Sequence, residues 1–512
     1  MLGLLSLGLV PAAGAQAVRF DASRVAELLP SSGILNNSVS NLHAEGDSLW
    51  IGPFLNLTTD GGQSWQVADT DSLGGTANRT FSIDVEGSVI WVGLGYNDNS
   101  SGDGVQSAAG FLVSTDGGQS FSYRFPQLDA PGDEQITYGV STLGALPVIV
   151  PQQSPPFDID YDPVHDEVWV AGWASGIRRS SDGGRTWQRV VLPPDDLDAI
   201  QPDEPYDFVV EPQRGSMGNL NHMGFAVLVD ESGTVWAGTP KGVNRSTDGG
   251  VSWQRFSANG TTSALTGSWV ISIEEQPMPG PNPIWMATWN AGEAGEEGQF
   301  GITVTRDGGE RFEKVLVGER VYDFAFEGTT VYAAGENGLF ITEDGGISWR
   351  TARDFRDPLR AERILRPDTP IFSVATTRDA LWAGTGDGLV KSLNGGLTWA
   401  LFRVEVPLNP DTPTFAVPRV ETFAYPNPFS AAADRFVRIR FEAPRASGVD
   451  LRIFDFGMNL VRNLSDTRQD DGIREVLWDG KDDNGLRIAN GTYFYEVKAG
   501  GETLWGKILV IE

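Results

Sequence analysis

Apolar and polar residues alternate in short runs along most of the chain. Phe81–Val85 and Phe157–Tyr161 are examples in which every second residue is apolar. A second run follows each of them, with Trp or Tyr between aliphatic residues and Gly or Ala behind, as in Leu49–Gly52 and Val235–Gly238. A period of two residues with β-branched and aromatic enrichment is typical of β-strands. The pattern therefore predicts repeated pairs of short strands.

An octapeptide follows each pair of runs. It begins with Ser or Thr, carries Asp at its third position and Gly at its fifth, and ends on an aromatic residue, as in Ser246–Trp253. The copies occupy residues 58–65, 114–121, 180–187, 246–253, 305–312, 342–349 and 392–399. Asp can accept hydrogen bonds from backbone N–H groups and Gly adopts positive φ easily, so the octapeptide predicts a tight turn between two strands. We interpret its third residues as turn formers rather than catalysts: Asp60, Asp116, Asp182, Asp248, Asp307, Asp344 and, in the last copy, Asn394.

Each unit contains four strands, which we call A, B, C and D. The octapeptide forms the turn that connects strand C to strand D, and seven such units follow one another. Repeated four-stranded units are typical of a β-propeller. We therefore predict an all-β protein with a seven-bladed β-propeller over residues 16–404. Residues 1–15 form a short apolar stretch that ends in Ala13-Gly14-Ala15, which predicts a signal peptide.

Four connections between strands are longer than the others: residues 95–110, 123–156, 192–223 and 289–301. The B–C and D–A connections of a propeller emerge on one face, and the octapeptide turns emerge on the other. We therefore expect all four insertions on one face. Long loops on a rigid scaffold often carry binding or catalysis, so we expect any site there.

Aromatic residues follow strand B in three of the units. Flat rings beside acidic and amide groups suit a glycan by stacking, whereas the simpler interpretation is that they cover the ends of blades. The predicted ligand-binding residues are Tyr96, Trp173 and Trp289, with Glu293 from the fourth insertion and His222 from a Gly- and amide-rich segment. They predict a propeller that binds a glycan, a peptide or a protein through its insertion-bearing face.

A second hypothesis is a glycoside hydrolase that uses a pair of loop carboxylates, since such enzymes place two carboxyl groups on either side of the scissile bond. The candidates are Asp98, Asp103, Asp133, Glu134, Glu293, Glu296 and Glu297. A third hypothesis is a structural surface spacer. Activity screening on sialosides and plant or algal polysaccharides separates the second hypothesis from the other two.

The amino-acid composition excludes several kinds of functional site. The chain has no Cys, which excludes disulfides and thiol nucleophiles, and its three His residues are scattered, so we expect no metal site and no cofactor. A formal net charge of -30 argues against binding to nucleic acid. The apolar stretch at the start is too short to span a membrane. We expect a monomer.

A Pro-rich segment, residues 405–420, has the composition of a semi-rigid linker. Residues 421–512 lack the octapeptide and contain short alternating runs, which predict a small β-sandwich. The expected strands are 437–441, 449–454, 475–478, 491–498 and 505–511.

The octapeptides resemble the Asp-box, or bacterial neuraminidase repeat, over most of residues 39–404. This resemblance implies the propeller fold and not one activity, because sialidases, xyloglucanases and assembly factors share it. The arginine motif of sialidases precedes the first box, whereas the nearest match here, Phe355–Pro358, follows the sixth, so no sialidase residue is carried over. Related xyloglucanases use two propellers around a cleft, and this chain has one.

The C-terminal segment resembles the immunoglobulin-like domain of flagellar hook-cap proteins and the type A sorting domain of the type IX secretion system. The matching residues are Tyr425–Phe429, Val449–Gly457, Trp478–Gly485, Gly491–Tyr495 and Gly506–Val510. The resemblance implies an immunoglobulin-like sorting domain over residues 421–512 and the type IX secretion machinery as a partner. It also implies a protein that is secreted, or held at the outer-membrane surface, of a Gram-negative bacterium.

Overall fold

The computed structural model describes residues 34, 37–67, 78–100, 104–212, 218–290, 298–358, 364–366, 368–403, 421–425, 427–430, 436–443, 448–466 and 472–511. It divides into two units, Met1–Ile364 with Asp368–Arg403, and Leu365–Pro367 with Val404–Glu512. The predicted signal peptide and linker, and the candidate acids Asp103, Glu293, Glu296 and Glu297, lie outside the described residues.

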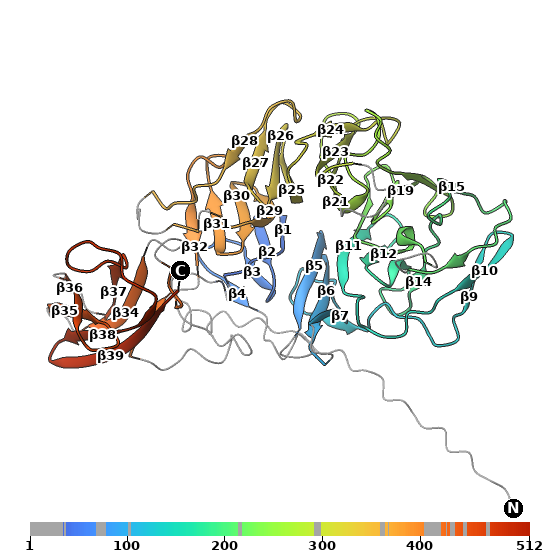
Figure 1. The fold of residues 1–512 in the computed structure, drawn as a ribbon. Coiled ribbons are helices and arrows are strands. Elements are labelled where there is room, and N and C mark those ends of the chain that lie inside the picture. The colour runs from blue at the N-terminus through green and yellow to red at the C-terminus, as the bar shows by residue number, and fades with distance from the viewer. Residues whose placement is uncertain are drawn as a thin grey trace, which may run out of the picture. The chain divides into compact units, whose positions relative to one another are not determined.

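Within the described residues, the first unit contains seven antiparallel blades, each built on four strands in chain order (Figure 1). Blade 1 holds β1(Leu42–Glu45), β2(Ser48–Ile51), β3(Asn56–Thr58) and β4(Gln66–Val67); blade 2 holds β5(Arg79–Glu86), β6(Val89–Asp98), β7(Val105–Ser114) and β8(Ser122–Arg124). Blade 3 holds β11(Pro156–Asp162), β12(Glu167–Gly172), β13(Gly176–Ser180) and β14(Gln188–Arg189); blade 4 holds β17(Ala226–Val229), β18(Val235–Thr239), β19(Gly242–Ser246) and β20(Trp253–Phe256). Blade 5 holds β21(Trp269–Glu275), β22(Ile284–Trp289), β23(Gly301–Thr305) and β24(Glu313–Val315); blade 6 holds β25(Val321–Glu327), β26(Thr330–Gly335), β27(Gly338–Thr342) and β28(Arg350–Ala352). Blade 7 holds β29(Ile371–Thr377), β30(Ala380–Thr385), β31(Gly388–Ser392) and β32(Ala400–Phe402), so the predicted seven-bladed β-propeller is confirmed.

The ring closes between blades 7 and 1. First strands of neighbouring blades contact one another around the ring, including β29 and β1, and are therefore the innermost strands. The backbone N–H of Val39 donates to the Thr385 carbonyl at 2.9 Å, and the Lys391 ammonium donates to the Gly61 carbonyl at 2.7 Å. In the part of the chain that the structure describes, blades 7 and 1 are each one continuous stretch, so no strand is shared across this junction.

The octapeptide turns have the hydrogen bonds that their sequence predicts. In blade 4 the Ser246 hydroxyl donates to Asp248 Oδ1 at 2.7 Å and accepts from the Gly250 N–H at 2.8 Å. The same carboxylate accepts from the backbone N–H of Ser252 at 2.8 Å and from its hydroxyl at 2.6 Å. In blade 6 the hydrogen bonds from Ser348 hold the pKa of Asp344 at about 2. Each turn is thus fixed by its own side chains.

The turns also join neighbouring blades. Gly250 has φ +82°, and a Cβ atom there would lie 2.7 Å from the ring of Trp169 in blade 3, so this position requires Gly for two reasons. The Arg179 guanidinium of blade 3 donates to the carbonyl of Gly249 at 2.9 Å. The Trp of strand B therefore packs beneath the turn of the following blade, which accounts for the joint recurrence of Trp and the Gly pair in the sequence.

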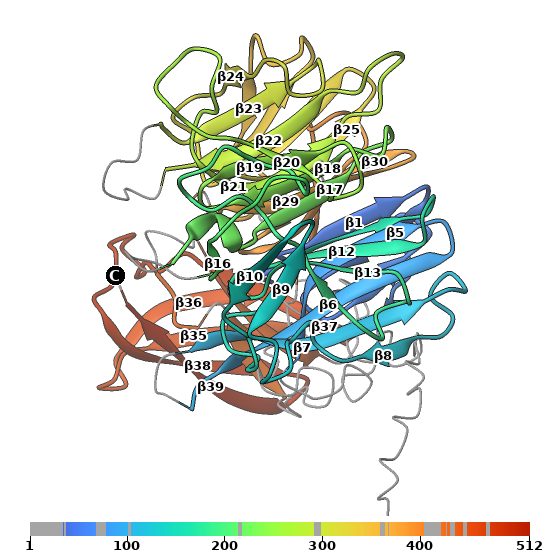
Figure 2. The ribbon, with the colours of Figure 1, turned by 90° about the vertical axis from the view of Figure 1, so that its right-hand side faces the viewer.

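The two long D–A insertions pair with one another. β9(Gln135–Tyr138), β10(Ser141–Ala145) and β16(Val209–Val210) form a separate three-stranded sheet, and β15(Ala199–Ile200) adds a fifth strand to the outer edge of blade 4 (Figures 1 and 2). The Tyr138 hydroxyl donates to the carbonyl of Val251, in the octapeptide turn of blade 4. The expectation that these insertions stay on one face is therefore wrong, because their apolar side chains are buried against the outer strands of blades 3 and 4.

The first insertion, residues 95–110, was predicted as a long connection between two strands, but most of it is strand. β6 and β7 continue into residues 95–98 and 105–110, paired across a register shift at Leu94 and Gly95. The insertion is thus an extension of blade 2.

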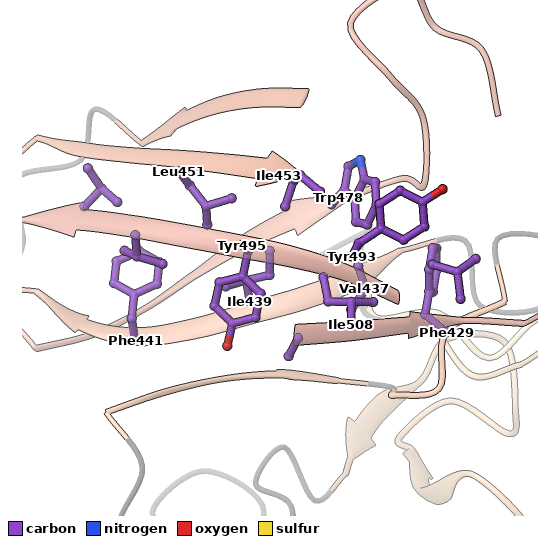
Figure 3. Close-up of a cluster of buried hydrophobic side chains, with 14 of the residues drawn as sticks. Phe429, Val437, Ile439, Phe441, Leu451, Ile453, Trp478, Tyr493, Tyr495 and Ile508 are labelled. Carbon is purple, nitrogen blue, oxygen red and sulfur yellow. The ribbon is translucent and has the colours of Figure 1, made fainter. Parts of the chain in front are cut away.

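The second unit is an immunoglobulin-like sandwich. One sheet has the order β33(Thr422–Tyr425), β34(Val437–Ala443), β37(Gly472–Trp478), and the other has the order β36(Leu460–Asp466), β35(Val449–Phe454), β38(Gly491–Ala499), β39(Glu502–Val510). Figure 3 shows the core between them, in which Leu451, Ile453, Tyr495 and Trp478 are almost fully buried. The sequence pattern predicted all of these strands except β33 and β36.

Candidate functional site

Aromatic rings form a belt at one end of the innermost strands of the propeller. Blades 2 to 7 each contribute one ring at or next to the start of the first strand: Phe81, Phe157, Phe225, Trp269, Tyr322 and Phe372. Trp173 and Trp289 join them from the ends of the second strands, and all eight side chains are half-buried. We call these eight residues the aromatic belt.

The belt is nearly continuous. The ring centroids of Phe81 and Phe157 lie 6.3 Å apart, those of Phe157 and Phe225 6.2 Å, and those of Phe225 and Trp269 5.2 Å. Trp269 lies opposite Trp289 on the neighbouring strand of blade 5. The belt then continues through Trp289 and Tyr322 at 5.5 Å and through Tyr322 and Phe372 at 6.0 Å.

β-Bulges place four of the rings. The register between the first two strands shifts around Phe81, Phe157, Tyr322 and Phe372, so each of them is the extra residue of a bulge. A bulge re-aims a side chain that would otherwise follow the alternation of its strand. The bulges therefore turn these rings out of the blade interfaces.

The two predicted Trp residues are part of this belt. Trp173 lies 5.0 Å from the ring of Phe225 and 5.7 Å from that of Trp269. Trp289 donates from Nε1 to the Val321 carbonyl at 2.8 Å, which fixes its orientation toward blade 6. The structure thus brings together two candidates that lie far apart in the sequence.

The structure places the other candidates elsewhere. Tyr96 lies opposite Ser107 within the extended hairpin of blade 2, and Phe81 supplies the ring of that blade to the belt. His222 is only 5% exposed; its Nδ1 accepts from the Glu211 N–H at 3.0 Å and its Nε2 lies 3.1 Å from the Leu192 carbonyl. Burial lowers the pKa of His222 to about 4, so it is a neutral packing residue of the second D–A insertion.

Carboxylates line the same innermost strands. The Oδ2 atom of Asp158 accepts from the Val227 N–H at 2.9 Å, and that of Asp84 accepts from the Tyr161 N–H at 2.8 Å, so each ties its blade to the next. Burial raises the pKa of Asp158 to about 7 and raises the pKa values of Asp160 and Glu274 well above their ordinary values. The interior of the ring is therefore lined by half-buried carboxyl groups whose pKa values are raised.

The described loop acids are held by nearby groups. Asp98 accepts from the Gln152 amide at 2.8 Å and from the Ser100 N–H at 2.9 Å, and these hydrogen bonds lower its pKa. Asp133 accepts from the Ala130 N–H, and Glu134 is exposed. Within the described part of the chain, no group of three or more His, Asp or Glu side chains is arranged to hold a metal ion.

Sequence reasoning missed the six rings on the first strands, although a signal was present. In blades 2, 3, 4, 6 and 7, one residue of the first strand pairs with the Gly or Ala that ends the repeated phrase of the second strand. The residue immediately before it in the sequence is aromatic. Alternation alone assigns such a residue to a strand face. The β-bulge that redirects the aromatic side chain cannot be seen in the pattern of apolar residues, because a bulge depends on how two strands pair.

Comparisons with known proteins support this architecture. Residues 430–502 match the family described as FlgD Ig-like domain. The chain is 24% identical over 290 residues, 53% of its length and 77% of the relative, to a photosystem II assembly lipoprotein, Ycf48, of Synechococcus. Among solved structures, the GH74 xyloglucanase from Xanthomonas campestris has a TM-score of 0.50 at 12% identity, covering 96% of this chain and 69% of that one.

A further similar structure is PorZ, described as an essential bacterial surface component of the type-IX secretion system of Porphyromonas gingivalis. It has a TM-score of 0.44 at 14% identity, and the chain spans 93% of its own length but only 66% of PorZ. In the described residues no helix is long and apolar enough to cross a membrane. The chain is therefore an all-β protein in which a seven-bladed propeller precedes a FlgD Ig-like domain.

Proposed function

We propose that the propeller is a binding module that takes a polypeptide segment at the mouth surrounded by the aromatic belt. The observation that carries this proposal is the contribution of one half-buried ring from each of six consecutive blades. The planes of neighbouring rings are tilted by 42° between Phe81 and Phe157 and by 39° between Phe225 and Trp269. Such rings present edges and partial faces around a mouth, which suits apolar side chains better than it suits the flat stacking of a sugar.

The acidic interior restricts the ligand. Asp158, Asp160 and Glu274 lie on the innermost strands and resist ionisation because they are buried near one another. A negative group inserted among them would be repelled by those that ionise, whereas a neutral group would not be repelled and a basic group would be attracted. The inserted part of the ligand is therefore neutral or basic.

The C-terminal unit supports a surface location. Residues 430–502 match the FlgD Ig-like domain, and the C-terminal segment resembles a type IX sorting domain. The fold of the chain is also similar to that of a surface component of a secretion system. The protein is, on this proposal, exported through its C-terminal unit. Deletion of everything after Pro418 then leaves the propeller inside the cell envelope, as fractionation and immunoblotting will show; undiminished extracellular protein would contradict export by this unit.

Peptide selection tests the binding proposal. Peptides displayed on phage are selected on the full-length protein, and the affinities of synthetic copies are measured by fluorescence polarisation. Tyr322→Ala and Trp173→Ala are expected to weaken binding at least tenfold, because each removes a ring from the belt. Phe125→Ala is the matched control, since Phe125 is 66% exposed and lies outside the belt. Failure to select any peptide, or equal affinity in all variants, would refute the proposal.

A second candidate function is glycoside hydrolysis, and the raised pKa of Asp158 favours it. A carboxyl group with a pKa of about 7 is protonated near neutral pH, as a general acid must be. This function predicts release of reducing sugar from xyloglucan or sialosides that Asp158→Asn abolishes. Absence of both peptide binding and hydrolysis would leave the surface spacer as the remaining hypothesis.

A further inference from the structure

The outer face of the larger sheet in the immunoglobulin-like unit carries ordered rows of side chains. Strand register places residues of β36, β35, β38 and β39 side by side, and residues two apart on a strand share a face. From one end of the sheet to the other, the rows are Ser465, Asp450, Lys498 and Thr503; Asn463, Arg452, Glu496 and Trp505; and Leu460, Phe454, Phe494 and Lys507. The opposite face of the same strands forms the core drawn in Figure 3.

Four rings lie together on this outer face. Phe454 and Trp505 have centroids 5.7 Å apart with planes 32° from parallel, and Phe456 and Phe494 are 6.3 Å apart at the same angle. Phe456 is 78% exposed and Trp505 is 48% exposed. We call Phe454, Phe456, Phe494 and Trp505 the aromatic face. Because its rings stand on one open face of a sheet, they present a surface that a ligand can lie across.

The polar rows beside these rings are balanced in charge. Arg452 forms an ion pair with Glu496, and Lys498 Nζ lies 3.3 Å from Glu496 Oε1. Asp450 and Glu496 therefore offset Arg452 and Lys498, and the exposed Lys507 at the end of the aromatic row leaves the three rows with one excess positive charge. A single excess charge attracts an anionic polymer or an anionic lipid surface only weakly, because salt screens it and stable electrostatic binding takes several basic residues.

A depression continues the face beyond the ion pairs. Its volume is about 480 Å³, and Asp450, Ser465 and Lys498 line it together with Gly448, Gly500 and Gly501. These three polar side chains can donate and accept hydrogen bonds, and the glycines leave the backbone accessible. A ligand that crosses the rings would thus reach hydrogen-bonding groups at one end.

We propose that this face binds a neutral polysaccharide chain. Exposed rings such as Phe456 and Trp505 stack against the apolar faces of sugar rings, and charged side chains in neutral pairs hydrogen-bond to hydroxyl groups without requiring a charged ligand. The near balance of charge on the face is the property that suits an uncharged, hydroxyl-rich chain. The site lies in the immunoglobulin-like unit and is independent of the aromatic belt.

Affinity electrophoresis and calorimetry of the full-length protein with soluble laminarin, xyloglucan and xylan test this proposal. At least one of these polymers is expected to bind, and Trp505→Ala is expected to weaken that binding at least tenfold. Phe456→Ala is a second variant that leaves the core intact, because this side chain is largely exposed. Ile347→Ala is the matched control, since Ile347 is 88% exposed and belongs to the propeller.

The alternatives give different results. Lack of binding to all three polymers, or unchanged binding by both face variants, overturns the proposal. A dimer in sedimentation velocity that Trp505→Ala dissociates would assign the face to a second copy of the chain. Binding to neutral or anionic lipid vesicles that the same substitution abolishes would assign it to a membrane surface. Thermal unfolding of each variant confirms that the comparison concerns folded protein.

Discussion

Replacement of Asp158 by Asn is expected to make the propeller more stable at high pH and to remove part of its pH dependence. Asp158 lies on β11, accepts the Val227 N–H of blade 4 and has a pKa raised by burial from 3.8 to about 7. Asn retains an oxygen that accepts this hydrogen bond and carries no charge. Asn loses the second acceptor, which takes the Ile159 N–H, at every pH, so the cost of ionising this side chain is measured by how the stability difference changes with pH.

The raised pKa of Asp158 determines whether stability rises or falls with pH. Between pH 4 and pH 7 the side chain is protonated in the folded protein and ionised in the unfolded chain, so the free energy of unfolding falls as pH rises and levels off above pH 7. A rise in pKa from 3.8 to about 7 corresponds to at most about 4 kcal/mol, at about 1.4 kcal/mol per unit. The stability of Asp158→Asn relative to the natural protein should grow by up to this amount between pH 4 and pH 8.

Urea unfolding followed by Trp fluorescence at several pH values measures this difference. Asp379→Asn is the control, because Asp379 is exposed and should give a nearly constant difference. A difference for Asp158→Asn that also stays constant from pH 4 to pH 8 would show that Asp158 ionises freely in the folded ring. The acidic interior described for the propeller would then be wrong.

Three further substitutions test the packing of the propeller. Asp248→Ala removes the acceptor of four hydrogen bonds in the turn of blade 4 and should lower stability by roughly 1–3 kcal/mol, measured by thermal unfolding; an unchanged midpoint would contradict the role of the turn. Asp129→Asn leaves the 2% exposed guanidinium of Arg178 without its charged partner and should cost about 3–5 kcal/mol in urea unfolding. Lys391→Met removes the hydrogen bond to the Gly61 carbonyl, so amide exchange in blade 1 should accelerate about fivefold or more, since about 1 kcal/mol corresponds to that factor; unaltered exchange would show that this bond contributes nothing to closure.

The fold could be predicted because the sequence repeats its own units. Seven copies of one octapeptide fix seven hairpins, and local hydrogen bonds such as those of Asp248 need no distant partner. The predicted strands of the C-terminal unit were also correct where alternation was clear, as in Val449–Phe454. Strand β36 was missed because its sequence, LVRNLSD, lacks regular alternation of apolar and polar residues. It is an edge strand, and its pairing with β35 contains a register shift.

The candidate site was only partly predictable. Trp173 and Trp289 were found because they follow a repeated phrase, whereas Phe225 and Tyr322 were hidden in runs that looked like core strands. His222 was selected for its unusual segment, yet the ring is neutral and buried under the insertion. Bulges and the packing of insertions depend on which segments meet in space, and single-sequence patterns do not report this.

The way the ring closes has a consequence for its mechanics. Because the described sheets of blades 7 and 1 each consist of consecutive chain, the boundary between these blades is held by packing and a few hydrogen bonds, including Val39 to Thr385, instead of a strand borrowed from the opposite terminus. This boundary is the natural fracture line of the propeller. The aromatic belt draws its rings from blades 2 to 7, so a ligand seated across it would bridge those blades and leave this boundary as the place where the circle opens first.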